Sequence, residues 1–208
     1  QFDSVEQQRE ASNLGMWMFL ITEIMFFGGL ILTYVVYRML YFQAFADASN
    51  TLNLKLGTIN TAVLIGSSLT MALAVHAAQV SKRKALIFFL ILTILLGSVF
   101  LGIKVVEYAD KFHHHHVPGA TFEFKEENAK DPLHTQIYFS LYFCMTGLHP
   151  LHMIIGVGLL SWLVFNSWKG RYSAAYFAPV ENCGLYWHFV DIVWIFLFPF
   201  LYLISRHH

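Results

Sequence analysis

Ionisable side chains stand inside long apolar stretches of this sequence, where hydrogen bonding or chemistry must account for them. Glu23 is the only acid in the apolar run from Leu14 to Tyr37. It lies about 14 Å from the start of that run, near mid-membrane, where an unpaired charge costs several kcal/mol. The carboxyl could belong to a proton route or bond a neighbouring helix. We favour the structural bond, with histidines of the fourth and fifth runs as its expected partners.

Two histidines share one helical face in the fourth apolar run. His149 and His152 are three residues apart, a spacing that suits two ligands of one metal. Two ligands are too few, and the sequence contains no Glu-x-x-His pair to complete a bundle metal site. We therefore expect no metal here, and two neutral imidazoles that bridge helices by hydrogen bonds.

The last apolar run places His188 and Asp191 one helical turn apart. The two groups can satisfy each other, which predicts a structural pair; no nucleophile with an adjacent base accompanies them. Trp187 and Trp194, seven residues apart, mark one flank of this helix. We assign these tryptophans and Arg38 as lipid or subunit contacts, and we expect no catalytic residue in the chain.

Two further groups of ionisable residues lie at or beyond the end of the third run. Lys104 and Glu107, three residues apart, predict a self-neutralising ion pair at the membrane interface. The run His113–His116 reads as part of a solvated loop, because consecutive side chains point in different directions and no further ligand is spaced to complete a metal site. Its role is undefined, and His207–His208 are either native or the remnant of a tag.

Composition and hydropathy define the elements that must carry these residues. Of 208 residues, 57% are hydrophobic and 12% charged, about half the charged share of a soluble domain. The formal net charge is zero, which gives no field to attract nucleic acid. Each long run is apolar around most of its circumference, as lipid-embedded helices are. The sequence thus predicts an all-α membrane protein, a five-transmembrane-helix bundle with spans at about 14–37, 58–79, 85–108, 137–168 and 185–205.

The chain is expected to form a single membrane domain over residues 14–205. The densest basic patch, Lys82–Lys84, lies in a short loop and favours a cytoplasmic position for that loop. The segment 1–13 is then a cytoplasmic N-terminal segment, and 109–136 a charged extracytoplasmic loop. The fourth run is too long for a straight span, so we expect it to tilt, protrude or bend at Pro150.

Small residues within the runs indicate where helices approach one another closely. They are Gly28–Gly29, Gly66–Ser68, Gly97, Gly102, Gly156 and Gly158.

Four segments resemble motifs of subunit III of the haem-copper terminal oxidases, in the order in which that family carries them. They are GMWMFLITEIMFF at 15–27, KVVEY at 104–108, TGLHPLHMIIG at 146–156 and YWHFVDIVW at 186–194. The resemblance covers about residues 14–205. Longer members of the family have seven spans, the first two splayed to form a lipid-filled cleft, whereas this chain begins at what resembles the third.

The resemblance implies an accessory membrane subunit with no cofactor of its own. Haem and copper would lie in partner subunits I and II, while this chain would pack against subunit I, hold phospholipid and support proton uptake and turnover stability. The family's intramembrane carboxyl would correspond to Glu23. Its helix-bridging His and Asp residues would correspond to His149, His152, His188 and Asp191.

Our interpretation is subunit III of a proton-pumping cytochrome c oxidase in a bacterial inner membrane, with the N-terminus cytoplasmic. Further subunits of a respiratory complex could also be partners. An equivalent subunit of a quinol oxidase or a nitric oxide reductase is an alternative that the sequence leaves open. A small proton-coupled transporter that uses Glu23, His149 and His152 is disfavoured, because internal repeats with matching helix breaks are missing.

Overall fold

The computed structural model describes residues 5–113, 132–174 and 176–203, and these residues are 91% helical with no strand. Most of the predicted loop, including His114–His116, and the pair His207–His208 lie outside the described residues. The helices run in chain order as α1 (Val5–Leu40), α2 (Phe42–Asn50), α3 (Leu54–Gln79), α4 (Arg83–His113), α5 (Pro132–Trp168) and α6 (Ala178–Tyr202).

Five of these helices are long and apolar enough to cross a membrane, which confirms the predicted all-α membrane fold. The first four predicted spans each fall within one of them, and the fifth, 185–205, begins inside α6 and runs past its end at Tyr202. Several helices also extend beyond the apolar runs. α4 continues to His113, and α5 already begins at Pro132 and runs on through Pro150. Polar residues at a membrane surface can continue a helix, so the hydropathy boundary underestimates helix length.

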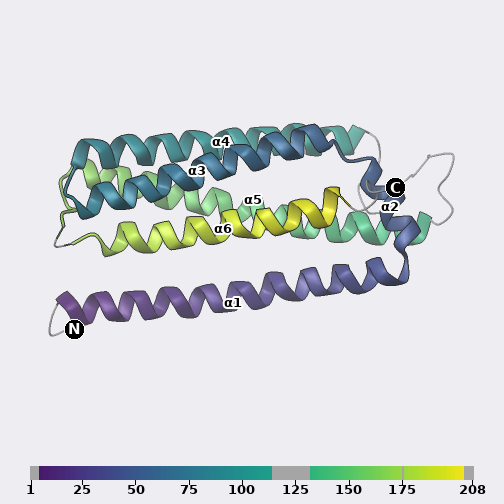
Figure 1. Cartoon of the computed structure of the whole chain (residues 1–208), viewed down its shortest axis with the longest axis horizontal. Helices are drawn as coiled ribbons and strands as arrows, with labels where there is room; N and C mark the ends of the chain where they lie inside the picture. Colours follow the sequence, from purple (N-terminus) through teal and green to yellow (C-terminus); the bar gives the residue numbers. More distant parts are fainter. Residues whose placement is uncertain (1–4, 114–131, 175, 204–208) are drawn as a thin grey trace.

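The short helix α2 was not predicted, because its nine residues are too few and too polar to register as a span. It buries Ala44, Phe45 and Ala48, and its Ser49 hydroxyl donates to the Leu201 carbonyl at 3.0 Å. The next helix starts at a capping asparagine, whose side chain accepts from two backbone N–H groups of α3. α2 therefore closes one end of the bundle, beside the end of α6 (Figure 1).

Helices α3 to α6 form a bundle, and α1 lies along its side (Figure 1). α6 packs against α1, α3 and α5, whereas α1 meets only α2, α5 and α6 among the described helices. The most hydropathic stretch of α6 is accordingly 56% buried, and that of α1 only 17%. α1 therefore exposes most of its apolar surface.

Two glycines let the bundle close around the Trp187 ring. A Cβ atom on Gly97 of α4 would stand 2.8 Å from this ring, and one on Gly156 of α5 would also stand 2.8 Å away. Only glycine allows both backbones to approach so closely. These two sites agree with the predicted close approaches, whereas a Cβ on Gly28, Gly29, Gly102 or Gly158 would meet nothing within 4 Å.

The loop between α3 and α4 and the loop between α5 and α6 lie at the other end of the bundle, where hydrogen bonds join them. Ser81 takes a left-handed conformation with φ 54°, and its hydroxyl accepts the Ala174 N–H at 2.8 Å. Arg83 donates to the Ser167 carbonyl at 2.9 Å. Tyr172 lies in the same loop region, where burial raises its phenol pKa to about 12 and keeps it neutral at physiological pH.

Candidate functional site

Glu23 and His152 form a pair between α1 and α5, with 3.2 Å between Oε2 of the carboxyl and Nε2 of the imidazole. A histidine partner for Glu23 was predicted, and this distance confirms it. The other ring nitrogen of His152 donates to the Leu148 carbonyl at 2.9 Å. Nδ1 carries a proton in this arrangement. One further proton, shared between Nε2 and the carboxyl, makes the pair either two neutral groups or an imidazolium–carboxylate ion pair.

The pair lies near mid-span on both helices and is open to the surface. Glu23 stands halfway along the span Glu6–Leu40, and the two side chains are 20% and 13% exposed. They line a groove of about 440 Å³, named here the polar groove. Its walls come from α1 (Met16, Phe19, Glu23), α5 (Leu151, His152, Ile155, Leu159) and α6 (Cys183, Tyr186).

A second groove, of about 540 Å³, runs between α1 and α6. It is named here the apolar groove, because His188 is its one lining residue with an ionisable side chain. Its walls are Trp17, Leu20, Ile24, Phe27, Gly28 and Ile31 of α1, and Leu185, His188, Phe189, Ile192, Val193 and Phe196 of α6. The two grooves therefore differ in the chemistry of what could fill them.

Lys104 and Glu107 form a second ion pair, 2.7 Å from nitrogen to oxygen, with side chains 2% and 4% exposed. The predicted self-neutralising pair is confirmed, and its position at the membrane interface stays a prediction; within the bundle, α5 and α6 enclose the pair. Tyr202 accepts from Lys104 at 2.9 Å and also bonds Glu107, to which Tyr142 donates at 2.9 Å. The Lys104 ammonium lies 4.3 Å from the Trp194 ring centroid, within cation–π range.

His149 does not join His152 in one site. Its ring is fully buried against Phe100 and Trp194, at centroid distances of 5.3 and 5.2 Å, and neither ring nitrogen has a hydrogen-bond partner among the described residues. The expected helix-bridging bond is therefore present for His152 and missing for His149. His149 packs in the bundle and His152 turns to α1, so this pair does not fit a haem or copper site. The described part of the chain also gathers no three His, Cys, Asp or Glu residues suited to one metal ion.

The predicted bond between His188 and Asp191 is wrong. His188 Nδ1 instead shares a 2.7 Å hydrogen bond with the Ser68 hydroxyl of α3. Asp191 is 2% exposed, and neither carboxyl oxygen has a hydrogen-bond partner among the described residues. A spacing of three residues permits such a pair, as Lys104 and Glu107 show, but the hydroxyl on the facing helix takes the imidazole instead.

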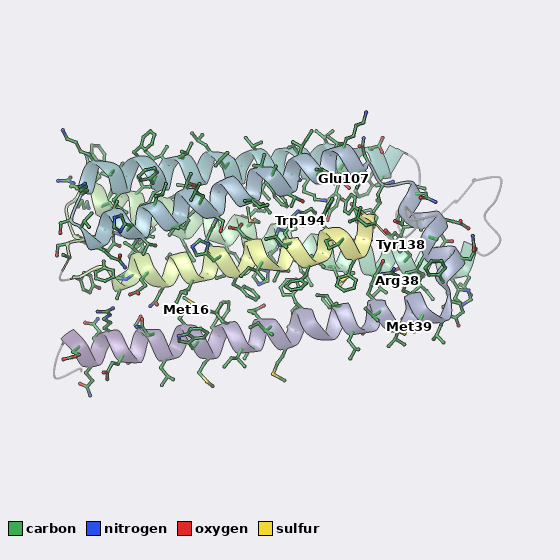
Figure 2. The ribbon with its side chains drawn as sticks, viewed as in Figure 1. Met16, Arg38, Met39, Glu107, Tyr138 and Trp194 are labelled. Carbon is green, nitrogen blue, oxygen red and sulfur yellow. The ribbon has the colours of Figure 1, made fainter. Side chains whose placement is uncertain are left out.

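Trp187 and Trp194 lie in the interior, so their assignment as lipid or subunit contacts is wrong. Their exposed fractions are 1% and 0%, and their indole N–H groups donate to Ser67 and Thr61 of α3 at 3.0 and 3.1 Å. Figure 2 shows Trp194 and Glu107 among the bundle helices. Arg38 is half-buried near the end of α1, and a lipid or subunit contact there stays a prediction.

Several buried hydroxyl groups that the sequence reading did not single out complete these polar contacts. Tyr138 donates to the Leu201 carbonyl at 2.9 Å, and Tyr34 donates to the Phe200 carbonyl at 2.6 Å. Both acceptors lie in the last turn of α6, which ends at Tyr202. The last carbonyl groups of any helix have no helical partner, and that was the available signal.

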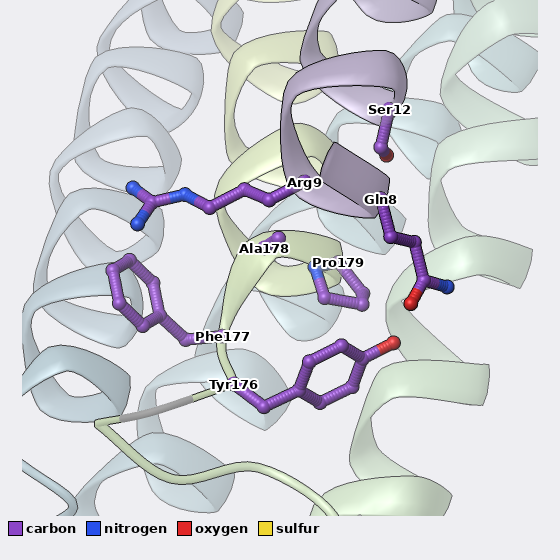
Figure 3. Close-up of a pocket in the computed structure, with 7 residues that line it drawn as sticks. All are labelled: Gln8, Arg9, Ser12, Tyr176, Phe177, Ala178 and Pro179. Carbon is purple, nitrogen blue, oxygen red and sulfur yellow. The ribbon is translucent and has the colours of Figure 1, made fainter. Parts of the chain in front are cut away.

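A smaller pocket, of about 60 Å³, lies where the beginnings of α1 and α6 meet (Figure 3). Arg9 lines it, lies over the Phe177 ring and forms a 3.4 Å ion pair with Glu181. The pocket also includes Gln8, Ser12, Tyr176, Ala178 and Pro179.

These features define a class: an all-helical, five-span membrane protein whose intramembrane polar groups mostly bond across helices. Comparison with known proteins adds the family, since the family model described as cytochrome c oxidase subunit III matches residues 4–206. The chain belongs to this family and is therefore a subunit of a haem-copper oxidase complex, associated with other oxidase subunits.

Individual relatives are similar over almost the whole chain. A protein of Thermostichus vulcanus named cytochrome c oxidase subunit 3 is 30% identical over 205 residues, covering 98% of this chain and 92% of the relative. A probable quinol oxidase subunit 3 of Staphylococcus haemolyticus is 31% identical over 204 residues, covering 98% and 94%. The corresponding protein of Staphylococcus aureus is 30% identical with the same coverage.

Proposed function

We propose that this chain is the accessory subunit III of a cytochrome c oxidase in the aerobic respiratory chain of a bacterial inner membrane, with its N-terminus in the cytoplasm. Haem and copper belong to subunits I and II, and the chain itself is not catalytic. One observation carries the proposal. Within a family of oxidase subunits, the paired residues Glu23, His152, His188, Lys104 and Glu107 bond other helices and His149 packs between aromatic rings, and these residues do not converge on a ligand site.

The function of this subunit is to pack against subunit I, bind phospholipid, and support proton uptake and stability during turnover. Glu23, His149, His152, His188 and Asp191 act as its intramembrane structural residues. The largely apolar lining of the apolar groove suits a lipid acyl chain, and Arg9 near the beginning of α1 suits an anionic headgroup. α1, with most of its surface exposed, supports a role in contacts beyond the chain.

The test is removal of this chain alone from the purified complex. Haem and copper content and initial turnover should be retained, while activity should decay faster during sustained turnover. Restoring the chain should restore the stability. A fall in haem or copper content with the other subunits intact would contradict a cofactor-free accessory role.

Quinol oxidase is the second candidate, favoured by the staphylococcal relatives of equal similarity. The two readings differ in the electron donor, which is bound by other subunits. Oxidation of reduced cytochrome c by the purified complex, with a copper-binding subunit or a c-type haem present, supports the first. Oxidation of quinol alone supports the second. Proton flux through the isolated chain in liposomes would instead support a transporter.

A further inference from the structure

We infer that the polar groove is an interface for a membrane helix of another oxidase subunit, and that this helix brings a hydrogen-bond donor to Glu23. The inference rests on the proposed function and assigns the face at which the partner binds. One oxygen of Glu23 bonds His152, while no described residue donates to the other, Oε1. The carboxyl therefore has an unfilled acceptor that points to a partner of defined chemistry.

The depth of Glu23 limits what can fill this acceptor. About 25 Å of helix separates it from each end of α1, so it lies near the centre of the hydrocarbon region. Lipid acyl chains carry no donors, and a polar atom exposed to them without a partner costs several kcal/mol. A side chain donor on a transmembrane helix, such as a hydroxyl, amide or indole N–H, meets the requirement at this depth.

The shape of the groove fits the same occupant. Its volume of about 440 Å³ accommodates more than one side chain, and its rims present apolar groups from two helices. On α5 these are Leu151 and Ile155, 50% and 49% exposed, and on α1 the rim includes Phe19, 37% exposed. A partner helix lying along these rims would insert apolar side chains around one central donor.

The apolar groove provides the contrast that separates a protein partner from lipid. It also opens at the surface beside α1, but its lining offers no carboxyl group, and its one imidazole, His188, bonds Ser68 through Nδ1. An acyl chain there leaves no carboxyl oxygen without a donor. The two grooves flank the same helix, so their occupants should differ because of their lining groups.

Photo-cross-linking from matched positions in the intact complex tests the inference. Ile155 lines the polar groove and Ile192 the apolar groove, and they are 49% and 51% exposed. Both lie roughly 20 Å from the helix ends that the loop 169–177 joins, so their depth in the membrane is the same. Each is replaced in turn by p-benzoylphenylalanine, and the adducts are identified by mass spectrometry.

The expected result is an adduct between position 155 and a transmembrane segment of another oxidase subunit, with mainly lipid adducts at position 192. Lipid adducts alone at 155, or an adduct with a second copy of this chain, would overturn the inference. If haem- and copper-bearing subunits co-purify in that case, the proposed function stands while the interface falls. If no oxidase subunit co-purifies, both fall.

The donor is tested separately with two variants of Glu23. Glu23→Gln keeps an acceptor oxygen and should remain in the complex, whereas Glu23→Leu removes it and should dissociate at least tenfold faster in detergent. Helical content of each isolated variant, measured by circular dichroism, controls for misfolding. Equal retention of two well-folded variants would show that Glu23 accepts no bond from the partner.

Discussion

Two ion pairs lie within the spans of this subunit, and they differ in how far the chain itself satisfies them. Lys104 and Glu107 are almost completely buried, and two tyrosine hydroxyls and a tryptophan ring complete their surroundings. Glu23 and His152 are partly exposed in a groove, with one carboxyl oxygen unfilled. The folded chain alone supplies all the partners of the first pair. The second pair, on our proposal, gains its last hydrogen-bond partner only in the complex.

Glu107→Gln should have the largest effect on the stability of the isolated chain. The substitution keeps the shape but leaves the Lys104 ammonium buried without a counter-charge, a loss of about 3–5 kcal/mol. Unfolding of the purified chain in mixed micelles by increasing sodium dodecyl sulfate measures it. The double variant Lys104→Met with Glu107→Gln is the control and should recover much of the loss. An unchanged midpoint for the single variant would show that the pair is not required.

Gly156→Ala tests whether the interior around the pairs is closely packed. The new Cβ would come within 2.8 Å of the Trp187 ring, and overpacking of this kind costs about 1–3 kcal/mol. The same unfolding measurement applies. Gly158→Ala, two residues further on and open to the surface, should be neutral or slightly stabilising. Equal destabilisation by both variants would contradict a specific contact with Trp187.

Trp194→Phe should weaken the enclosure of Lys104 by a smaller amount. It removes the indole bond to Thr61 and reduces the cation–π contact, together about 1–2 kcal/mol. Thr61→Val is the matched variant, because it removes only the hydrogen-bond acceptor and should cost less. If the threonine variant were as destabilising as the tryptophan variant, the ring contact with Lys104 would contribute nothing.

Glu23→Gln should have the smallest effect on the isolated chain, less than about 1 kcal/mol. An amide replaces the carboxyl nearly isosterically and can still bond His152, with no buried counter-charge left alone. The comparison with Glu107→Gln in the same unfolding assay is direct, since one substitution is made at both acids. A loss at Glu23 as large as that at Glu107 would mean that the open pair is ionised and holds the isolated fold together.

The sequence predicted the spans because lipid imposes a simple length and polarity requirement on them. It also predicted a histidine partner for Glu23, since a carboxyl at that depth has few other bonding groups within reach. It did not predict α2, whose residues carry no span signal. It predicted the pairing of Lys104 and Glu107 but not its burial, because the tyrosines that enclose it come from helices far apart in the sequence.

The sequence did not reveal which side of each helix faces the bundle interior. A helix that is apolar around its whole circumference has no hydrophobic face to mark the interior, so Trp187 and Trp194 could not be assigned to the core. The same ambiguity affected His188, which bonds Ser68 on another helix instead of Asp191 on its own. Contacts between helices depend on rotation about each axis, and hydropathy does not encode that rotation in these spans.

α6 is the most enclosed of the described spans, and it follows all the others along the chain. The ribosome therefore delivers four spans into the bilayer before the helix that contacts all of them has been made. During that interval Ser67 and Ser68 have no indole or imidazole from α6 to bond, and the translocon or the lipid must accommodate them. Completion of the bundle therefore waits for the synthesis of α6.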